Sequence, residues 1–225
     1  MIEYINIWKK KLDFFLFKKV SSSKLIFNIK VKSNKINYFL ELKNIKDKNN
    51  FLWFGNWDDN KIDLSKYRKY SPSYNSVFQI YKENLDYTEC EEYKIKSKLI
   101  QLGQSSGRGK DLNELDDYFK SLDTLKDSLK THGYKSQIEL NNSTKVNDEI
   151  GVVIGSNWEL IKLQDKFGGT HRFALCKIFN INEIVVSVKA IHQDLLGKED
   201  LNIILNDNDN SKIKSFLEKK ILSKY

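Results

Sequence analysis

The fold is constrained most by a patterned stretch between residues 149 and 192. Two short apolar runs, 149–156 and 158–164, each have the length of a strand and are separated by one residue. A glycine-containing loop follows, and residues 173–179 then carry apolar side chains at helical spacing. The β-branched run 184–188 comes last. This order predicts strand, tight turn, strand, loop, helix and strand.

The loop before the helix has the sequence Asp-Lys-Phe-Gly-Gly-Thr-His-Arg. Its two glycines allow the backbone to approach a ligand closely. We expect Thr170 to cap a helix that begins at His171, so that free N–H groups and the positive end of the helix dipole face the loop. A loop of this kind suits a phosphate or another anion, and His171 and Arg172 would add side-chain donors.

A second interpretation is an ordinary loop with a solvated His-Arg pair at the start of the helix. The composition favours the anion site. The chain has only three arginines, Arg68, Arg108 and Arg172, amid a large excess of lysine, and lysine does not replace the planar fork of a guanidinium. His171 is likewise one of three histidines. The hypothesis requires that the Arg172 guanidinium is not already tied to an internal carboxylate.

Residues 167–172, Phe-Gly-Gly-Thr-His-Arg, closely resemble the Phe-Gly-Gly-Cys-His-Arg signature of sulfiredoxins. The pattern over residues 148–192 is similar to the ParB/sulfiredoxin superfamily, often labelled the ParB-like nuclease domain, and residues 133–140 resemble its beginning. The first half of the chain lies outside the resemblance. The superfamily includes nucleotide-dependent DNA-partition proteins, sulfiredoxins and kinases of free serine. The resemblance implies that nucleoside triphosphate phosphates bind at Gly168, Gly169, Thr170, His171 and Arg172.

The chain departs from each branch of that superfamily. Thr170 stands where sulfiredoxins have a reactive cysteine, and an unactivated hydroxyl is a far weaker nucleophile than a thiolate, so sulfiredoxin activity is not expected. Residues 169–172 lack the acidic member of the Gly-Glu-Arg-Arg box of partition proteins. The serine kinases carry Asp-Gly-His-His-Arg, whereas Asp165 of this chain lies farther upstream.

In that superfamily the early segment of the domain faces the same pocket as the glycine loop. If residues 134–140 are its counterpart, Gln137 and Glu139 are the polar candidates there. A kinase needs a carboxylate near the acceptor hydroxyl and oxygen ligands for Mg²⁺. Glu139 and Asp165 are the candidates for both roles, with surface charge as the alternative. His192, after the last strand, either faces the site or lies on the surface.

The first half of the chain predicts a hairpin over residues 25–42, with its turn at Ser33-Asn34-Lys35, and helices over 74–84 and 91–102. Between them, residues 51–57 form an aromatic cluster, which serves either as a small core or as a stacking wall for a base or sugar. Residues 1–20 mix lysine with large aromatic side chains, which suits packing on the domain or an amphipathic helix on a membrane.

Residues 104–110 are rich in glycine and serine but lack the context of a Walker loop. They form either a plain linker or a lid whose Arg108 reaches a bound phosphate. Asp111 then caps a helix, Glu114 completes a capping-box pattern, and Gly133 ends the helix after a stripe of leucines. A last helix is expected over residues 211–225.

The 225 residues are 40% hydrophobic and 30% charged, enough for one large domain or two small ones. The net charge of +8 would suit an anionic partner, but the lysines are scattered among asparagine and isoleucine, which indicates solvated surface. Cys90 and Cys176 form no metal or redox motif, and Cys176 falls at a core position. The run 14–17 is too short for a signal or a span, so we expect a soluble, cytoplasmic protein.

We therefore predict an α+β protein in which a helix-and-hairpin extension, residues 1–110, joins a ParB/sulfiredoxin-like nucleotide-binding unit, residues 111–225. The first functional hypothesis is a phosphotransferase that uses ATP or another nucleoside triphosphate with Mg²⁺ and acts on a small hydroxylated acceptor. His171 would be catalytic with Glu139 or Asp165. The second is a DNA-binding or nucleotide-switched regulator. The near absence of arginines that could read bases argues against this second hypothesis.

Overall fold

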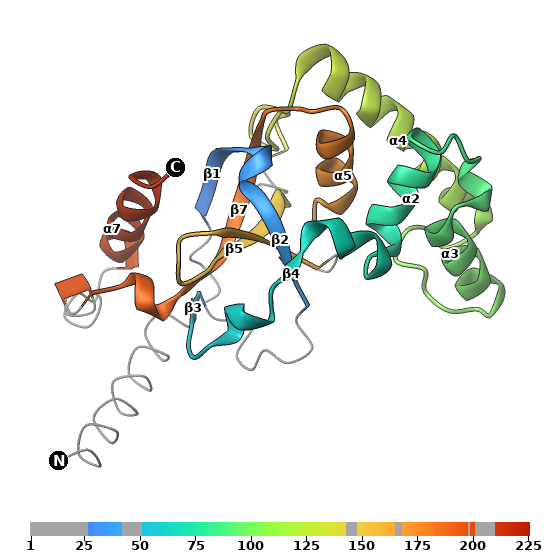
Figure 1. Ribbon diagram of the computed structural model, residues 1–225. Helices are drawn as coiled ribbons and strands as arrows, with labels where there is room; N and C mark the ends of the chain where they lie inside the picture. Colours follow the sequence, from blue (N-terminus) through green and yellow to red (C-terminus); the bar gives the residue numbers. More distant parts are fainter. Residues whose placement is uncertain (1–26, 42–50, 143–147, 165–167, 198, 201–209) are drawn as a thin grey trace.

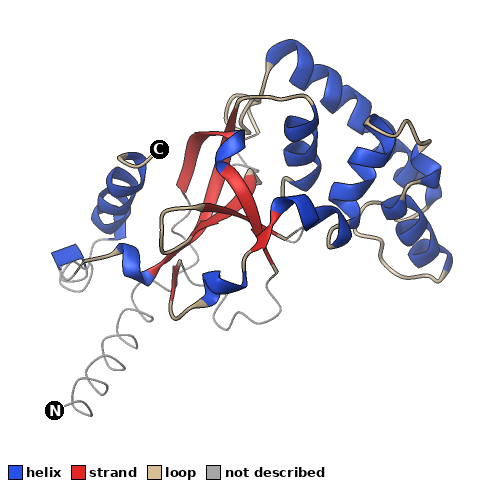
Figure 2. Cartoon of the chain, in the orientation of Figure 1, coloured by secondary structure: helices blue, strands red, loops and turns tan. Residues whose placement is uncertain are grey.

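The computed structural model describes residues 27–41, 51–142, 148–164, 168–197, 199–200 and 210–225, which form an α+β fold around one mixed sheet (Figures 1 and 2). The strands are β1 (Phe27–Lys32), β2 (Ile36–Leu40), β3 (Leu52–Trp53), β4 (Ile62–Asp63), β5 (Ile150–Ile154), β6 (Leu160–Leu163) and β7 (Glu183–His192). The α-helices are α2 (Pro72–Tyr81), α3 (Glu91–Gln101), α4 (Leu112–His132), α5 (Thr170–Ile178) and α7 (Asn210–Leu222). Short 3-10 helices are η1 (Ser33–Lys35), η3 (Trp57–Asn60), η4 (Leu64–Lys69), η5 (Tyr87–Glu89) and η8 (Gln193–Leu195).

The sheet has the order β1-β7-β5-β6-β2-β4, and β3 pairs with β7 outside this path. β5 and β6 are antiparallel neighbours joined by a tight turn, in which the N–H of Trp158 donates to the carbonyl of Gly155. β7 then pairs in parallel with β5, after the chain has crossed over through α5. The predicted order of strand, turn, strand, loop, helix and strand is confirmed.

Strands form in both arms of the predicted hairpin 25–42, but the prediction that these two strands pair with each other is wrong. β1 pairs with β7, and β2 pairs with β6 and β4. The three residues of η1 join β1 to β2, although β7, β5 and β6 lie between them in the sheet. Four strand intervals would span about 19 Å in a flat sheet, and the four residue steps of the link reach about 15 Å. The sheet therefore curves strongly and brings β1 and β2 together (Figure 1).

The core is continuous across the boundary predicted near residue 110. β5 and β6 are buried at every position, as expected of strands covered on both faces. One apolar cluster joins β1 and β2 residues such as Ile29 and Phe39 to Val152 of β5 and to Phe173 of α5. Strands from 1–110 and from 111–225 thus share one sheet and one core within the described residues.

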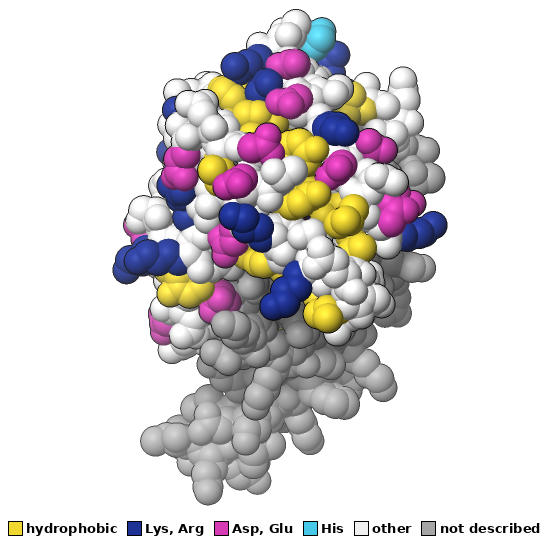
Figure 3. All heavy atoms as spheres, turned by 90° about the vertical axis from the view of Figure 1, so that its right-hand side faces the viewer, with side chains coloured by type: hydrophobic (Ala, Val, Ile, Leu, Met, Phe, Trp, Pro, Cys, Tyr) yellow, Lys and Arg dark blue, Asp and Glu magenta, His cyan; other side chains and the backbone are white. Residues whose placement is uncertain are grey.

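The helices pack mainly to one side of the sheet (Figure 1). α5 lies between the sheet and the group α2, α3 and α4, whereas α7 lies at the opposite side. α4 begins and ends as predicted, because the Asp111 side chain accepts from the N–H of Glu114 and Gly133 follows the last turn with φ +71°. Its buried stripe consists of Leu115, Phe119, Leu122 and Leu129. Basic and acidic side chains are interspersed with apolar ones on the helical face in Figure 3.

The aromatic cluster 51–57 is part of the core. Phe51, Trp53 and Trp57 are buried, and the rings of Trp53 and Trp57 meet edge to face at 5.0 Å. This arrangement favours the small-core interpretation over an open stacking wall. Residues 1–20 lie outside the described residues, so neither interpretation of that segment is tested. Among the helices that the structure describes, none is long and apolar enough to cross a membrane.

Candidate functional site

The amino end of α5 is built differently from the prediction. The helix begins at Thr170, and Gly169 occupies the N-cap position in the left-handed conformation, with φ +72°. A Cβ atom at Gly169 would lie 2.6 Å from Cα of Ile150, so only glycine fits between the helix and β5. Among the described residues no side chain caps the helix, and the prediction that Thr170 caps it is wrong because Thr170 is the first helical residue.

The amino end of α5 has no side-chain cap among the described residues, so the helix itself does not use its first backbone donors. The first N–H groups of any helix have no acceptor within the helix, and they carry the positive end of its dipole. The Thr170 hydroxyl is buried and has no hydrogen-bond partner among the described residues. Lys162 of β6, which is fully buried, places Nζ 3.4 Å from the carbonyl oxygen of Gly168. The Nζ of Lys162 also donates to the carbonyl of Leu163, so it holds the loop in place. The helix dipole and the Thr170 hydroxyl thus place positive potential and one donor at this loop.

A cavity of about 530 Å³ opens beside this amino end. One face of α4, Arg108, Gln137 and Asp148 line it together with Gly168, Gly169, Thr170, His171 and Arg172. The structure therefore brings the predicted glycine loop, His171, Arg172 and Gln137 together around one space. Its volume lies within the usual range for sites that bind small molecules.

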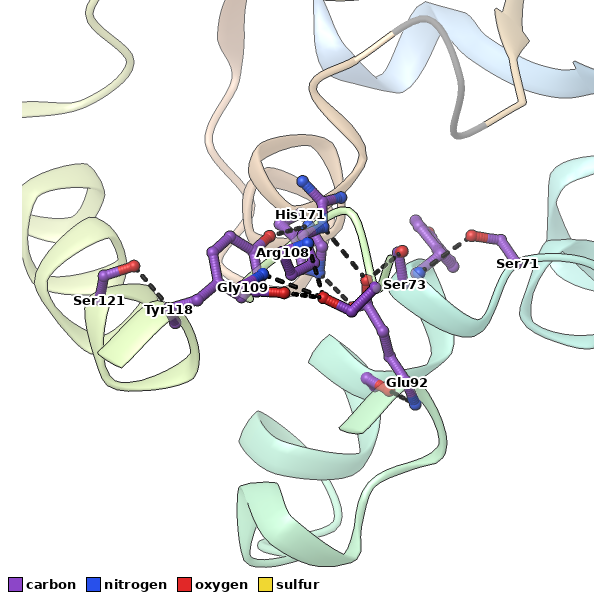
Figure 4. A network of polar contacts seen from close by, with 11 residues as sticks. Ser71, Ser73, Glu92, Arg108, Gly109, Tyr118, Ser121 and His171 are labelled. Carbon is purple, nitrogen blue, oxygen red and sulfur yellow. Dashed lines mark hydrogen bonds and ion pairs between the residues drawn. The ribbon is translucent and has the colours of Figure 1, made fainter. Parts of the chain in front are cut away.

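His171 joins three helices through its imidazole ring (Figure 4). Its Nε2 lies 2.6 Å from Oε2 of Glu92, which comes from α3. Its Nδ1 lies 3.0 Å from the hydroxyl oxygen of Tyr118, which comes from α4. The ring is buried, whereas Tyr118 lines the cavity and is partly exposed. His171 therefore reaches the cavity side through Tyr118.

Glu92 is an ionised carboxylate enclosed by the protein. Burial acts to raise its pKa, but the hydrogen bond and charge of His171, the hydroxyl of Ser73 at 2.8 Å and the charge of Arg108 together lower the pKa to about 2. Its backbone N–H also donates to the hydroxyl of Ser76. Glu92 thus fixes the amino end of α3 against α2 and holds the imidazole of α5 in one orientation.

Arg172 is tied to its own chain, which corrects the prediction that its guanidinium binds phosphate. Nη1 lies 3.2 Å from Oε2 of Glu149, whose side chain is completely buried, and Nη2 donates to the carbonyl of Asp148. The hydroxyl of Tyr134 and the amide oxygen of Gln137, oriented toward the guanidinium, accept from Arg172 at 3.3 and 2.8 Å. The requirement that Arg172 be free of an internal carboxylate is therefore not met, and the part of the anion-site hypothesis that depends on its guanidinium fails. Any anion site here depends on the backbone of the glycine loop and on other side chains at the cavity.

The two predicted carboxylates are not brought into the site. Glu139 does not line the cavity, and its carboxylate accepts from the backbone N–H and the hydroxyl of Ser136, which lower its pKa. Asp165 lies outside the described residues. His192 is buried away from the cavity, where Nε2 meets the carbonyl of Gly55 at 2.8 Å. A structural role accounts for the contacts of Glu139 and His192.

Arg108 is the guanidinium that faces the cavity. Its Nε lies 3.5 Å from Oε1 of Glu92, and its guanidinium carbon lies 4.9 Å from the centre of the Tyr118 ring. The side chain remains one-third exposed. The loop that carries Arg108 is ordered by Ser106, whose hydroxyl accepts from the N–H groups of Arg108 and Gly109. The segment 104–110 is thus more than a plain linker.

A Mg²⁺ ion would find few protein ligands here. The described residues hold no group of three or more histidine, cysteine, aspartate or glutamate side chains suited to a metal ion. Asp148 is the one carboxylate among the described residues that line the cavity. Because Mg²⁺ is commonly held by one or two carboxylates and by substrate phosphates, this donor fits an ion that arrives with a nucleotide.

The sequence does not predict the residues that bind His171 and Arg172, which are Glu92, Tyr118 and Glu149. Glu92 follows another glutamate at a helix start, a pattern typical of a solvated pair, and Tyr118 stands next to the core residue Phe119. Glu149 stands at the start of the apolar run 149–156, where the sequence predicts only a strand. No sequence spacing links these residues to α5, because the links are contacts across 23 to 79 positions.

Comparison with models of known protein families, with curated proteins and with solved structures finds no match to this chain. The resemblance of residues 167–172 to sulfiredoxins therefore stays a prediction.

Proposed function

We propose that the protein binds the phosphates of a nucleoside triphosphate at the amino end of α5 and transfers a phosphoryl group to a small hydroxylated acceptor. The observation that carries the proposal is the amino end of α5, which no side chain of the described residues caps, at the wall of a cavity of about 530 Å³. The buried Thr170 hydroxyl behind this wall also has no hydrogen-bond partner among the described residues. Helix amino ends with free N–H groups are favourable sites for phosphate.

Other groups at the cavity suit the charge stabilisation, Mg²⁺ binding and proton transfer that a phosphoryl transfer needs. Arg108 supplies a guanidinium for the charge that spreads over the phosphoryl oxygens. Asp148 would hold a Mg²⁺ ion, which neutralises phosphate charge when bound. His171, held by the carboxylate of Glu92, presents Nδ1 to the Tyr118 hydroxyl at the cavity, and histidine is the side chain most often used for proton transfer. Arg172 and Gln137 form part of the wall of the site and do not bind the ligand, because the Arg172 guanidinium binds the Gln137 amide and the buried Glu149 carboxylate.

The test is calorimetric titration with ATP, CTP, GTP and inorganic tripolyphosphate, each with and without Mg²⁺. The informative variant is Thr170→Val, which removes a buried hydroxyl of nearly unchanged shape. A hydrogen bond to a charged phosphate contributes roughly 1.5–3 kcal/mol, so the affinity of this variant should fall about 10- to 100-fold. Its stability without ligand should stay equal or rise, because an unsatisfied buried hydroxyl is removed.

Ser187→Ala is the matched control. Ser187 lies in β7 away from the cavity, and its hydroxyl is also buried without a hydrogen-bond partner among the described residues. This variant should bind the triphosphate as the wild type does. Absence of binding to the wild type, or equal affinity in Thr170→Val, contradicts the proposed site. Salt-dependent binding of duplex DNA without triphosphate binding would instead support the regulator hypothesis.

A further inference from the structure

The side chain of Arg108 lies between the cavity and a buried carboxylate. It lines the cavity beside α5 and also a second hollow of about 370 Å³ along the loop 105–110. Its guanidinium lies over the ring of Tyr118, with Nε 3.5 Å from Oε1 of Glu92. The side chain is 33% exposed, whereas that of Glu92 is 1% exposed. The guanidinium therefore has a partner inside the protein on one side and open space on the other.

The backbone that carries Arg108 is held in place. Ser106 is buried, and its hydroxyl accepts from the N–H groups of Arg108 and Gly109 and donates to the Gly109 carbonyl at 2.6 Å. Gly109 packs closely on the start of α4, because a Cβ there would lie 2.8 Å from the backbone nitrogen of Leu115. A change in the position of the guanidinium therefore needs only side-chain rotation, which is fast for exposed groups.

Arg108 is the most distant of three side chains that bind the carboxylate of Glu92 (Figure 4). His171 lies at 2.6 Å and the hydroxyl of Ser73 at 2.8 Å, against 3.5 Å for Nε of Arg108. Charge-assisted hydrogen bonds between nitrogen and oxygen are usually about 2.7–2.9 Å long. If Arg108 turns away, the buried carboxylate keeps its two short contacts and is not left unpaired. The contact with Arg108 is thus the one that can be exchanged.

We propose that Glu92 competes with a bound triphosphate for the guanidinium of Arg108. In the free protein Glu92 holds the guanidinium, and in the complex the phosphates take it over. This inference rests on the proposed function and deepens it, because it names a regulatory contact of the same site. A phosphate offers the planar fork of arginine a bidentate contact. Because coupling between two contacts is reciprocal, a triphosphate weakens the pair of Glu92 and Arg108 by the factor by which Glu92 lowers triphosphate affinity.

The test is a double-mutant cycle of Glu92→Gln and Arg108→Gln, with the affinity for ATP and Mg²⁺ measured by calorimetry. Arg108→Gln should lower the affinity about 10- to 100-fold, because a hydrogen bond to a charged phosphate is lost. Glu92→Gln should raise it about 5-fold, the lower end of usual couplings, and this gain should vanish when Arg108 is also replaced. The control is Arg68→Gln, which should bind as the wild type does, since Arg68 pairs with Glu83 outside the cavity.

A second readout uses the wild type and does not depend on the folding of any variant. The chain has only three arginines, Arg68, Arg108 and Arg172, so their Nε resonances can be assigned one by one. Titration with tripolyphosphate and Mg²⁺ should move the Nε resonance of Arg108 and leave that of Arg68 in place.

The possible outcomes separate this inference from the proposed function. If the wild type binds the triphosphate but Glu92→Gln binds it equally or less tightly, the inference alone is overturned. The same holds if the gain in Glu92→Gln persists without Arg108, because Glu92 would then act only through its charge, or if the Arg108 resonance does not move. A wild type that binds no triphosphate overturns the proposed function and the inference with it.

Discussion

The guanidinium of Arg172 is surrounded by acceptors from its own chain. It joins the start of β5, the segment around Gln137 and the first turn of α5. The rarity of arginine correctly indicated a position that needs a planar fork, but the fork binds an internal carboxylate, Glu149. A count of residue types does not show whether such a fork faces a ligand or the protein, because that depends on a buried partner distant in sequence.

Replacing Arg172 with methionine should therefore lower the free energy of unfolding. The change leaves the completely buried Glu149 without its ionic partner, and breaking a buried pair costs about 3–5 kcal/mol. The matched control is Arg68→Met, since Arg68 pairs with Glu83 where both side chains are exposed, and such pairs contribute about 0–1 kcal/mol. Urea denaturation measures both. Equal losses of stability in the two variants would contradict the internal role of Arg172.

Glu92 links stability to pH in acid. Burial alone would raise its pKa, but His171, Ser73 and Arg108 bring it from 4.5 to about 2 in the folded protein. A lowered folded pKa contributes stability that is fully present above pH 4.5 and is lost as pH falls toward 2. The wild type should thus be more stable than Glu92→Gln at pH 7, and the difference should shrink between pH 4.5 and 2. Denaturant titrations between pH 7 and pH 2 measure the free energy of unfolding of both proteins. A difference between them that stays constant with pH would contradict this prediction.

At the scale of elements, most of the helices and strands followed from local pattern. The 3.6-residue spacing of apolar side chains and the Asp111 cap located α4, and the two apolar runs located β5 and β6. The start of α5 was misplaced by one residue, because Gly169 rather than Thr170 occupies the N-cap. The contact that selects glycine there comes from Ile150, and sequence spacing does not reveal such a contact.

The close packing of Gly169 on β5 gives a prediction for this element. Gly169→Ala adds a Cβ that would lie 2.6 Å from Cα of Ile150, in a backbone conformation with φ +72°. Gly103→Ala is the control, because Gly103 has φ +68° but open space around the added atom. The control should cost about 1–2 kcal/mol for the left-handed conformation, and Gly169→Ala should cost more and also weaken triphosphate binding. Thermal unfolding and calorimetry report the two effects, and equal costs would be inconsistent with this packing.

At the scale of the whole molecule, the sequence indicated the α+β class but not the sheet order. Strands β1 and β2 are neighbours in sequence, but β7, β5 and β6 lie between them in the sheet. β1 pairs with β7 and β2 pairs with β6, and both partners come from the second half of the chain. Which strand pairs with which therefore depends on the whole sheet and not on the local sequence. The same assembly forms the cavity, since α4, the loop of Arg108 and the amino end of α5 line it together only in the folded chain. Glu92 of α3 supports this wall through His171.

The central claim is that an anion binds at the amino end of α5, and amide NMR of the whole chain tests it most directly. ¹H–¹⁵N spectra are recorded while ATP and Mg²⁺ are titrated into the wild type. The account predicts that the largest downfield shifts belong to the N–H groups of Gly169, Thr170 and His171, which hydrogen bonds to phosphate would deshield. The protein has a separate cavity of about 430 Å³, whose lining includes Lys35 and Trp158. No shift at the amides of α5, or larger shifts at this separate cavity, would contradict the claim.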